Sequence, residues 1–474
     1  MPKRNYFFFA ILFILILIYF LFAIKQAKKI DLRIDEIISI LIVKSINFEN
    51  SIPHLPSNNH YIFYLFHFYL SKIFSYFVNE DQLIIRLPNI FLHSISSILL
   101  YFLIIKLTAN EIKNLLFFSI VIIGISIFLF DLSFFYLSID GRFYESYILF
   151  FIIFLWLFFN NVKFSFLIIY LILSGIIIGP FFWLFLISFL IINFFYNREF
   201  CYKKFFLLIS IIFIFLFHLF LASNEKSIYI IFNHLKRFFI LNNPFYYLKN
   251  LFIYFPVLTI FFIIFFVKSR NKKILFQLFF PLFLIYFFLS FTFIKNIRLL
   301  YIISPLILLF VISELVLFGK KKILFFLFIF LIFLTNYIKY KTEYFYFFDP
   351  TRINFEKFKR LNDKEITDIL TTNPIICYYF KPDKNITVFR EEYYKDLINE
   401  KNINRCYYTG KIIITGKNSF LEYFENHSNF IFFTLQKEFF NNRMISKELR
   451  EMILKKMKYL SEFSSPKYFV FIKN

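Results

Sequence analysis

Two adjacent carboxylates, Asp35 and Glu36, follow directly after the first long apolar run of the chain. A third carboxylate, Asp140, lies in the stretch 138–144 beside Arg142. Acidic side chains at the edge of a membrane are costly unless they are paired, hold a cation or face water, so they indicate a functional site. They could act as a general base or hold a divalent cation. The alternative for Asp35 and Glu36 is a solvated start of a loop.

Basic side chains accompany these carboxylates. His60 and Arg86 lie before the second apolar run, and Lys295 and Arg298 precede a later one. An arginine guanidinium can bind two phosphate oxygens at once, so the combination suits a reaction on a lipid-linked phosphate. Taken singly, Arg86, Lys295 and Arg298 are also explained as interfacial side chains whose charged ends reach toward water.

Composition indicates the environment in which these residues work. The chain has 474 residues, of which 60% are hydrophobic, and a mean hydropathy of +0.69. Soluble domains are nearer 45–50% apolar, so we expect an integral membrane protein. The net charge of +23 comes from basic residues that flank the apolar runs, which indicates membrane orientation and not a nucleic-acid partner. With only 7 glycines, a nucleotide-binding loop is not expected.

Eleven apolar runs are near the ~17–25 residues that a membrane helix needs, some at the short end. They are residues 6–24, 88–107, 115–132, 143–160, 164–179, 181–196, 205–222, 250–267, 274–294, 299–318 and 323–339. The first follows Lys3 and Arg4 and has no small-residue cleavage site, which predicts a retained anchor with a cytoplasmic N-terminus. The segment 25–87 is then the first external loop, with an interfacial helix over 60–77.

Orientation follows from the connections between the runs. Every second connection carries basic residues: Lys113, Lys163, Arg198 with Lys203 and Lys204, the 268–273 loop, and Lys320 to Lys322. These connections are expected in the cytoplasm. An odd number of crossings places the C-terminus outside. The crossings themselves are largely free of charge, and the charges collect at one face.

Residues 340–474 differ from residues 1–339 in composition. Mixed charge and short apolar runs predict a small α/β domain outside the membrane. Its expected strands are 375–380, 386–390, 411–415, 430–434 and 468–472, and its clearest helix is 446–463. Cys377 and Cys406 could form a disulfide there or remain free thiols. None of the three cysteines, Cys201 included, has the spacing of a zinc site.

The order of the motifs resembles that of the GT-C superfamily of polyprenyl-phosphate-sugar glycosyltransferases. Within it, the chain is most similar to bacterial relatives of protein O-mannosyltransferases and of lipid A aminoarabinose or galacturonic acid transferases. The matching stretches are Asp35-Glu36 in the first external loop, a loose match at 58–67, Arg86-Leu87-Pro88, the stretch 135–144, and Arg298 with Pro305. The resemblance covers about the first 200 residues and the region near Arg298, and it does not extend to the C-terminal domain.

The chain departs from the family pattern at three places. The His-Pro-Pro prolines of the family are missing, and the second-loop acid is Asp140 instead of Glu. Gly179-Pro180 stands where the family often has His-Tyr. These departures concern the acceptor and any metal, and they affect the class of reaction less.

The resemblance implies an inverting transfer from a polyprenyl-phosphate sugar to a lipid, glycan or protein acceptor outside the cytoplasm. It implies Asp35 as the general base, with Glu36 and Asp140 as orienting groups. Asp35 and Asp140 would hold a divalent cation if one is used. Its substrate-binding residues would be His60, Arg86, Arg142, Tyr144 and Arg298. The enzyme would span the inner (plasma) membrane many times, with its active site and C-terminal domain outside the cytoplasm.

Two other functions fit parts of the sequence. A polymerase or ligase of lipid-linked glycans would need a large catalytic loop late in the chain, whereas the connection 223–249 is modest. A transporter or flippase would place ionisable residues in the middle of the membrane, often in repeated halves.

Overall fold

The computed structural model divides the chain into two compact units. Residues 1–27 and 54–342 form the helical unit, and residues 28–53 and 343–474 form the C-terminal unit. The structure describes residues 3–29, 36, 39–40, 43, 65–108, 115–141, 144–196, 207–216, 246–268, 272–290, 300–317, 322–341, 360, 368–373, 384–391, 398–399, 402–406, 411–442, 444–464 and 468–473.

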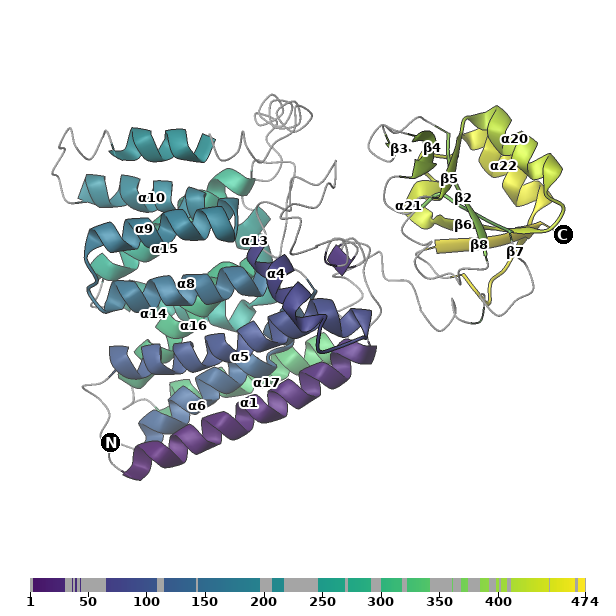
Figure 1. Cartoon of the computed structure of the whole chain (residues 1–474). Helices are drawn as coiled ribbons and strands as arrows, with labels where there is room; N and C mark the ends of the chain where they lie inside the picture. The colour runs from purple at the N-terminus through teal and green to yellow at the C-terminus, as the bar shows by residue number, and fades with distance from the viewer. Residues whose placement is uncertain are drawn as a thin grey trace. The chain divides into compact units, whose positions relative to one another are not determined.

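The described part of the helical unit consists of helices (Figure 1). Its helices are α1 (Lys3–Lys29), α4 (Leu65–Phe74), α5 (Asp81–Leu107), α6 (Leu115–Phe130), α7 (Leu132–Ser138), α8 (Tyr144–Phe159), α9 (Phe164–Ile177), α10 (Pro180–Tyr196), Leu207–Leu216, α13 (Tyr246–Tyr254), α14 (Pro256–Lys268), α15 (Lys272–Ser290), α16 (Leu300–Leu317) and α17 (Lys322–Lys341). Each of the eleven predicted apolar runs contains at least one of these helices. The ten residues of α4 span roughly 15 Å, which is half the hydrocarbon thickness of a bilayer.

Among the described residues, three helices are long and apolar enough to cross a membrane: α1, α5 and α17. The number rises to five if α6 with α7, and α13 with α14, are each counted as one bent span. Six further apolar helices have 10–17 described residues. Length and composition therefore support a membrane protein with three to five candidate spans.

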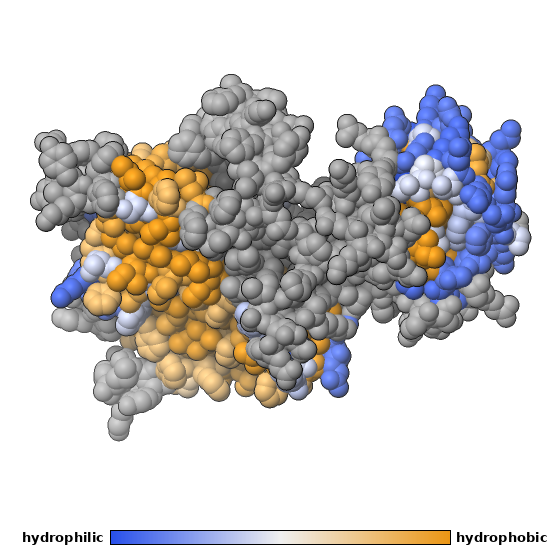
Figure 2. All heavy atoms as spheres, turned by 45° about the horizontal axis from the view of Figure 1, so that its top comes forward, coloured by the Kyte–Doolittle hydropathy of each residue, from blue (hydrophilic) through white to orange (hydrophobic). Residues whose placement is uncertain are grey.

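Burial along α1 follows the period of a helix. Leu12, Tyr19 and Ala23 lie on one side and are buried, whereas Phe13 and Leu21 are 62% and 60% exposed. Exposed phenylalanines and isoleucines also cover α17. Figure 2 shows that the described surface of the helical unit on this face is mostly hydrophobic. Such a surface is suited to lipid contact.

Two of the predicted runs are bent at a break in the helix. The first continues from α6 past Asp131 into α7 with a bend of 55°, and the second changes direction by 111° between α13 and α14, at Phe255. Asp131 caps α7, because its Oδ1 accepts a hydrogen bond from Ser133 N at 2.9 Å. The predicted run 115–132 therefore reaches just beyond the first break, and the run 250–267 contains the second.

A glycine permits the close approach of α6 and α16. A Cβ atom at Gly124 would lie 2.8 Å from Ile312 Cγ1, which is closer than such atoms pack. We expect Gly124→Leu to lower the free energy of unfolding by about 1–3 kcal/mol through overpacking. Unfolding in detergent micelles with increasing dodecyl sulfate would measure this loss. Ile312→Ala should restore part of it in the double variant, and a loss that is unchanged in that variant would contradict the close contact.

The C-terminal unit contains an eight-stranded mixed sheet with the order β3-β4-β5-β2-β1-β6-β8-β7. The strands are β1 (Asp368–Thr371), β2 (Asn385–Arg390), β3 (Ile398–Asn399), β4 (Asn402–Cys406), β5 (Ile412–Thr415), β6 (Phe430–Leu435), β7 (Lys458–Tyr459) and β8 (Tyr468–Lys473). The four central strands, β5, β2, β1 and β6, are parallel, and the outer pairings are antiparallel.

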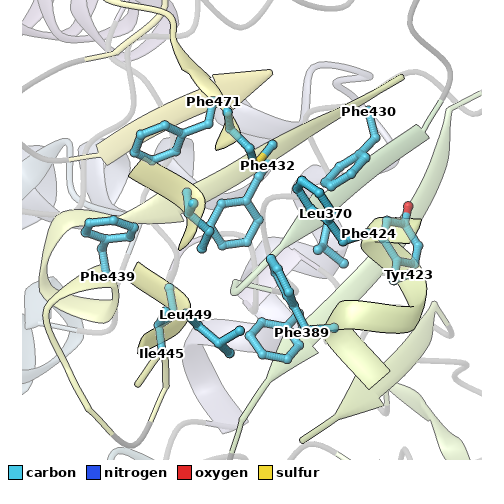
Figure 3. Packing of buried hydrophobic residues seen from close by; sticks show 13 residues of the cluster. Leu370, Phe389, Tyr423, Phe424, Phe430, Phe432, Phe439, Ile445, Leu449 and Phe471 are labelled. Atoms are coloured by element: carbon cyan, nitrogen blue, oxygen red, sulfur yellow. The ribbon is translucent and has the colours of Figure 1, made fainter. Parts of the chain in front are cut away.

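Aromatic side chains form the core of this unit (Figure 3). Alternate residues of β6, Phe430 and Phe432, face the helices α20 (Lys417–Asn426) and α22 (Lys447–Lys456). All six residues of β6 are buried, which is typical of a strand covered on both faces. The described surface of the C-terminal unit in Figure 2 is mostly hydrophilic, as expected of a domain in water.

Comparison with the predicted strands is favourable for four of the five. β2, β5, β6 and β8 match the predicted segments to within one residue, whereas 375–380 lies outside the described residues. β1, β3 and β4 were not predicted. The helix predicted over 446–463 is α22 and ends at Lys456, because the chain then enters β7. Cys406 lies on β4, while Cys201 and Cys377 lie outside the described residues, so the disulfide stays a prediction.

Candidate active site in the helical unit

A stripe of polar side chains runs along the buried face of α5. Arg86, Asn89, His93 and Ser97 are spaced by three or four residues, which places them on one side of a helix. All four are buried. Ser97 donates to the backbone oxygen of His93 in its own helix at 2.8 Å. The other three reach neighbouring elements, so α5 connects the parts of the candidate site.

Arg86 lies at the end of this stripe nearest the start of α5. Its Nη1 donates to the backbone oxygen of Ala27 at 2.6 Å, in the last turn of α1. The last carbonyl groups of a helix have no intrahelical donor, and a cation is favourable there. The Arg86 side chain is 1% exposed. Arg86 is therefore not an interfacial side chain whose charged end reaches toward water.

Asp140 is attached to the same stripe. Its backbone oxygen accepts a short hydrogen bond from Asn89 Nδ2, and its backbone nitrogen donates to Leu137 O at 3.0 Å. The residue is 5% exposed. Tyr144, 1% exposed, starts α8 four residues later. Two residues predicted from the sequence, Arg86 and Asp140, thus both adjoin α5, Arg86 as part of the helix and Asp140 through Asn89.

His93 forms the centre of a second, deeper group. Its Nδ1 lies 3.1 Å from both carboxylate oxygens of Glu145, and its Nε2 lies 3.0 Å from the backbone oxygen of Phe128. A carbonyl oxygen only accepts, so Nε2 carries a proton. A second proton then lies between Nδ1 and the Glu145 carboxylate. Both side chains are 0% exposed, and the pair as a whole is neutral whichever of them holds this proton.

Tyr19 of α1 packs beside this pair. Its ring centre lies 5.2 Å from that of His93, and its hydroxyl is buried. His93 is seven residues beyond Arg86, which corresponds to roughly 10 Å along the helix. Along α5 the site therefore has two levels, with Arg86 in the second turn of the helix and His93 two turns further on, where it meets Glu145 in the first turn of α8.

Four predicted site residues, Asp35, His60, Arg142 and Arg298, lie outside the described residues. Glu36 belongs to the C-terminal unit and is buried, with 1% of its side chain exposed. The described residues contain no group of three His, Cys, Asp or Glu side chains that could hold a metal ion. Of the two predicted metal ligands, Asp35 and Asp140, the structure describes the second.

Sequence reasoning missed Asn89, His93 and Glu145. Two signals in the sequence could have found them. Glu145 directly follows Tyr144 at the end of a motif already singled out, and His93 is an ionisable residue within an apolar run. Asn89 follows Arg86 by three residues and His93 follows Asn89 by four, a spacing that places all three on one face of α5. The expectation that the crossings are largely free of charge is incomplete, because the helices also bury Asp131 and Lys339.

Comparisons with known protein families and with curated proteins find no match for this chain. The functional argument therefore depends on the motifs of the sequence and on the geometry described above.

Proposed function

We propose that the protein is a GT-C-type membrane glycosyltransferase, which transfers a sugar from a polyprenyl-phosphate donor to an acceptor outside the cytoplasm. The observation that supports this most directly is the link between Arg86 and Asp140 through Asn89. The family resemblance requires an acidic residue and phosphate-binding arginines at one end of the bundle. Arg86 lies where α1 ends and α5 begins, and Asp140 lies four residues before the start of α8.

Eleven crossings of the inner (plasma) membrane form part of this proposal. The directions of the helices support it. The end of α1 meets the start of α5 through Ala27 and Arg86, and the end of α6 meets α5 through Phe128 and His93. The end of α17 meets the end of α6 through Lys339 and Asp131. Under this topology the C-terminal unit lies outside the cytoplasm, where it would help to select the acceptor.

The proposed reaction forms a bond between the acceptor oxygen and the anomeric carbon of the sugar. Asp35 accepts the proton of the acceptor hydroxyl as that oxygen attacks. The bond from the anomeric carbon to the phosphate oxygen breaks, and polyprenyl phosphate leaves with the electron pair. Arg298, with Arg142 or Arg86, offsets the charge that develops on the phosphate. Asp140 and Glu36 orient the reacting groups.

A transfer assay on membranes tests this function. Membranes with the full chain are incubated with radiolabelled polyprenyl-phosphate mannose, aminoarabinose or galacturonic acid, and the label is followed into lipid, glycan and protein fractions. We expect release of polyprenyl phosphate together with labelled acceptor. Membranes from the same cells without this chain are the control. Equal labelling in both preparations, for every donor, would contradict the proposal.

Arg298→Lys is expected to weaken the use of the donor without affecting insertion. The planar guanidinium binds two phosphate oxygens, whereas an ammonium offers a single point charge. Loss of one charge-assisted hydrogen bond should raise the donor concentration for half-maximal transfer by about tenfold. Arg270→Lys, in a predicted cytoplasmic loop, is the matched control. An unchanged donor dependence would leave Arg298 as an interfacial side chain.

A proton-coupled transporter is the second candidate function. The buried His93–Glu145 pair, which shares a proton about halfway along α5, is the observation that favours it. In sealed vesicles, a transporter would move labelled substrate without breaking the sugar–phosphate bond, and collapse of the proton gradient would stop this movement. A glycosyltransferase would break the bond and would be indifferent to the gradient.

A further inference from the structure

The two breaks in the helical unit create a problem for the backbone. α6 and α7 are separated at Asp131, and α13 and α14 at Phe255. At a helix end, carbonyl and amide groups lose their intrahelical partners. Inside a membrane protein these groups must be satisfied by other parts of the protein. The described part of the chain identifies where the partners come from.

One side chain, Lys339 of α17, reaches both breaks. Its Nζ donates to Ser133 Oγ at 2.7 Å and to the backbone oxygen of Tyr254, the last residue of α13, at 2.9 Å. It also lies 3.5 Å from Asp131 Oδ1. An ammonium has three N–H groups, and three acceptors surround this one. Lys339 is 6% exposed, so its charge is buried together with that of Asp131.

A second residue of α17 strengthens the contact with α7. Asn336 lies three residues before Lys339, and its Oδ1 accepts from the backbone nitrogen of Leu132 at 3.0 Å. α7 is therefore held at its first turn by a carboxylate cap, an amide and an ammonium. Its other end leads within two residues to Asp140.

We propose that Lys339 is a positioning residue, which fixes α7 and thereby the place of Asp140 in the site. Without the ammonium, the buried Asp131 carboxylate has lost its counter-charge, and the cap that starts α7 must take up a proton or admit water. Because α7 has only seven residues, a change at its start is transmitted to its end. The role of Asp140 in transfer rests on the proposed glycosyltransferase function. The placement of α7 by Lys339 is independent of that function.

Cysteine labelling tests this placement without an activity assay. Ser138→Cys, at the end of α7, is introduced into the full chain with Cys201, Cys377 and Cys406 replaced by Ser, and its rate of reaction with a small thiol reagent is measured in detergent. Ser138 is 0% exposed, so the wild-type rate is slow. Lys339→Met is expected to raise the rate by about tenfold through local opening. Lys339→Arg should stay near the wild-type rate, and Lys339→Met with Asp131→Asn should return toward it.

Two controls separate positioning from general loosening. Lys341→Met removes an exposed lysine from the same helix and should leave the rate unchanged. Ser174→Cys in α9, where Ser174 is 1% exposed, should react equally slowly with and without Lys339→Met. A rate at position 138 that is unchanged by Lys339→Met, or raised equally at position 174, would overturn the proposal. If Lys339→Met does not accumulate, Lys339→Gln is judged by the same two rates.

The outcome is distinguishable from that of the transfer assay. Faster labelling without any detectable transfer by wild-type protein would leave Lys339 as the residue that places α7 and would remove the glycosyltransferase. Transfer by the wild type, with labelling that Lys339→Met leaves unchanged, would support the glycosyltransferase and overturn the positioning role of Lys339.

Discussion

Membranes that carry Asp35→Asn are expected to transfer sugar about 10²–10⁴-fold more slowly than wild-type membranes, which is the usual contribution of a general base. Asparagine keeps the shape and polarity of aspartate but cannot accept the proton of the acceptor hydroxyl. Expression and insertion should therefore survive. The measurement is the initial rate of label transfer at saturating donor, normalised to the amount of protein in the membrane.

Two neighbouring carboxylates serve as comparisons for Asp35. Glu36→Gln should reduce the rate less if Glu36 only orients the substrates, and more if it holds a cation. Asp140→Asn should also be damaging, because Asp140 is the competing candidate for the base. A rate for Asp35→Asn within a few-fold of wild type, with Asp140→Asn inactive, would transfer the role of base to Asp140.

His93→Leu is expected to lower the free energy of unfolding by about 3–5 kcal/mol, the typical cost of removing one partner of a buried charge pair. Glu145 is 0% exposed and would be left without its imidazole partner, in a position where water cannot replace it. The carbonyl of Phe128 would lose its donor as well. Unfolding in detergent micelles with increasing dodecyl sulfate measures the change.

Removal of both partners should cost much less than removal of one. In the variant with His93→Leu and Glu145→Met, no buried charge remains, and apolar side chains of similar size fill the space. Ser94→Ala is a matched control, since the Ser94 hydroxyl bonds only within its own helix in the described contacts. If His93→Leu is as stable as the double variant, the pair carries no buried charge of consequence.

Much of the helical unit was predictable because hydropathy is a property of each segment alone. Each of the eleven runs contains a described helix, and α16 agrees with the predicted run to within one residue at each end. The breaks at Asp131 and Phe255 were not predicted. A window of hydropathy averages over single residues, and α13 and α14 are both apolar on either side of Phe255. Pro256, the first residue of α14, is the local signal, because a proline disfavours the helical conformation of the residue before it. The contact of Lys339 with the backbone oxygen of Tyr254 could not be predicted, since the two residues lie far apart in the sequence.

In the C-terminal unit, too, some elements could be predicted from their own sequence and others could not. β6 and β8 were predictable from runs of aromatic and β-branched residues, but β1, with the sequence Asp-Ile-Leu-Thr, is too short to be recognised alone. It becomes a central strand because β2 and β6 pair with it on both sides.

The candidate site was predicted where a residue type sufficed and missed where a pairing was needed. Arg86, Asp140 and Tyr144 were named from motifs. His93 taken alone is as well explained by an ordinary buried histidine, and its meaning depends on Glu145, which lies 52 residues later in the chain. Such a pairing requires the packing of α5 on α8.

Lys339 also has a consequence for the order in which the protein is made. It lies on the last helix of the helical unit, so the ribosome synthesises both broken helices well before their shared partner. During this interval Asp131 has no ammonium beside it, and a carboxylate is costly to bury without a counter-charge. The nascent chain must therefore keep the two breaks hydrated, or in contact with the insertion machinery, until residue 339 has been added. We therefore expect a polypeptide that ends before α17 to be less stable than the full chain, because it buries the Asp131 carboxylate without the Lys339 ammonium.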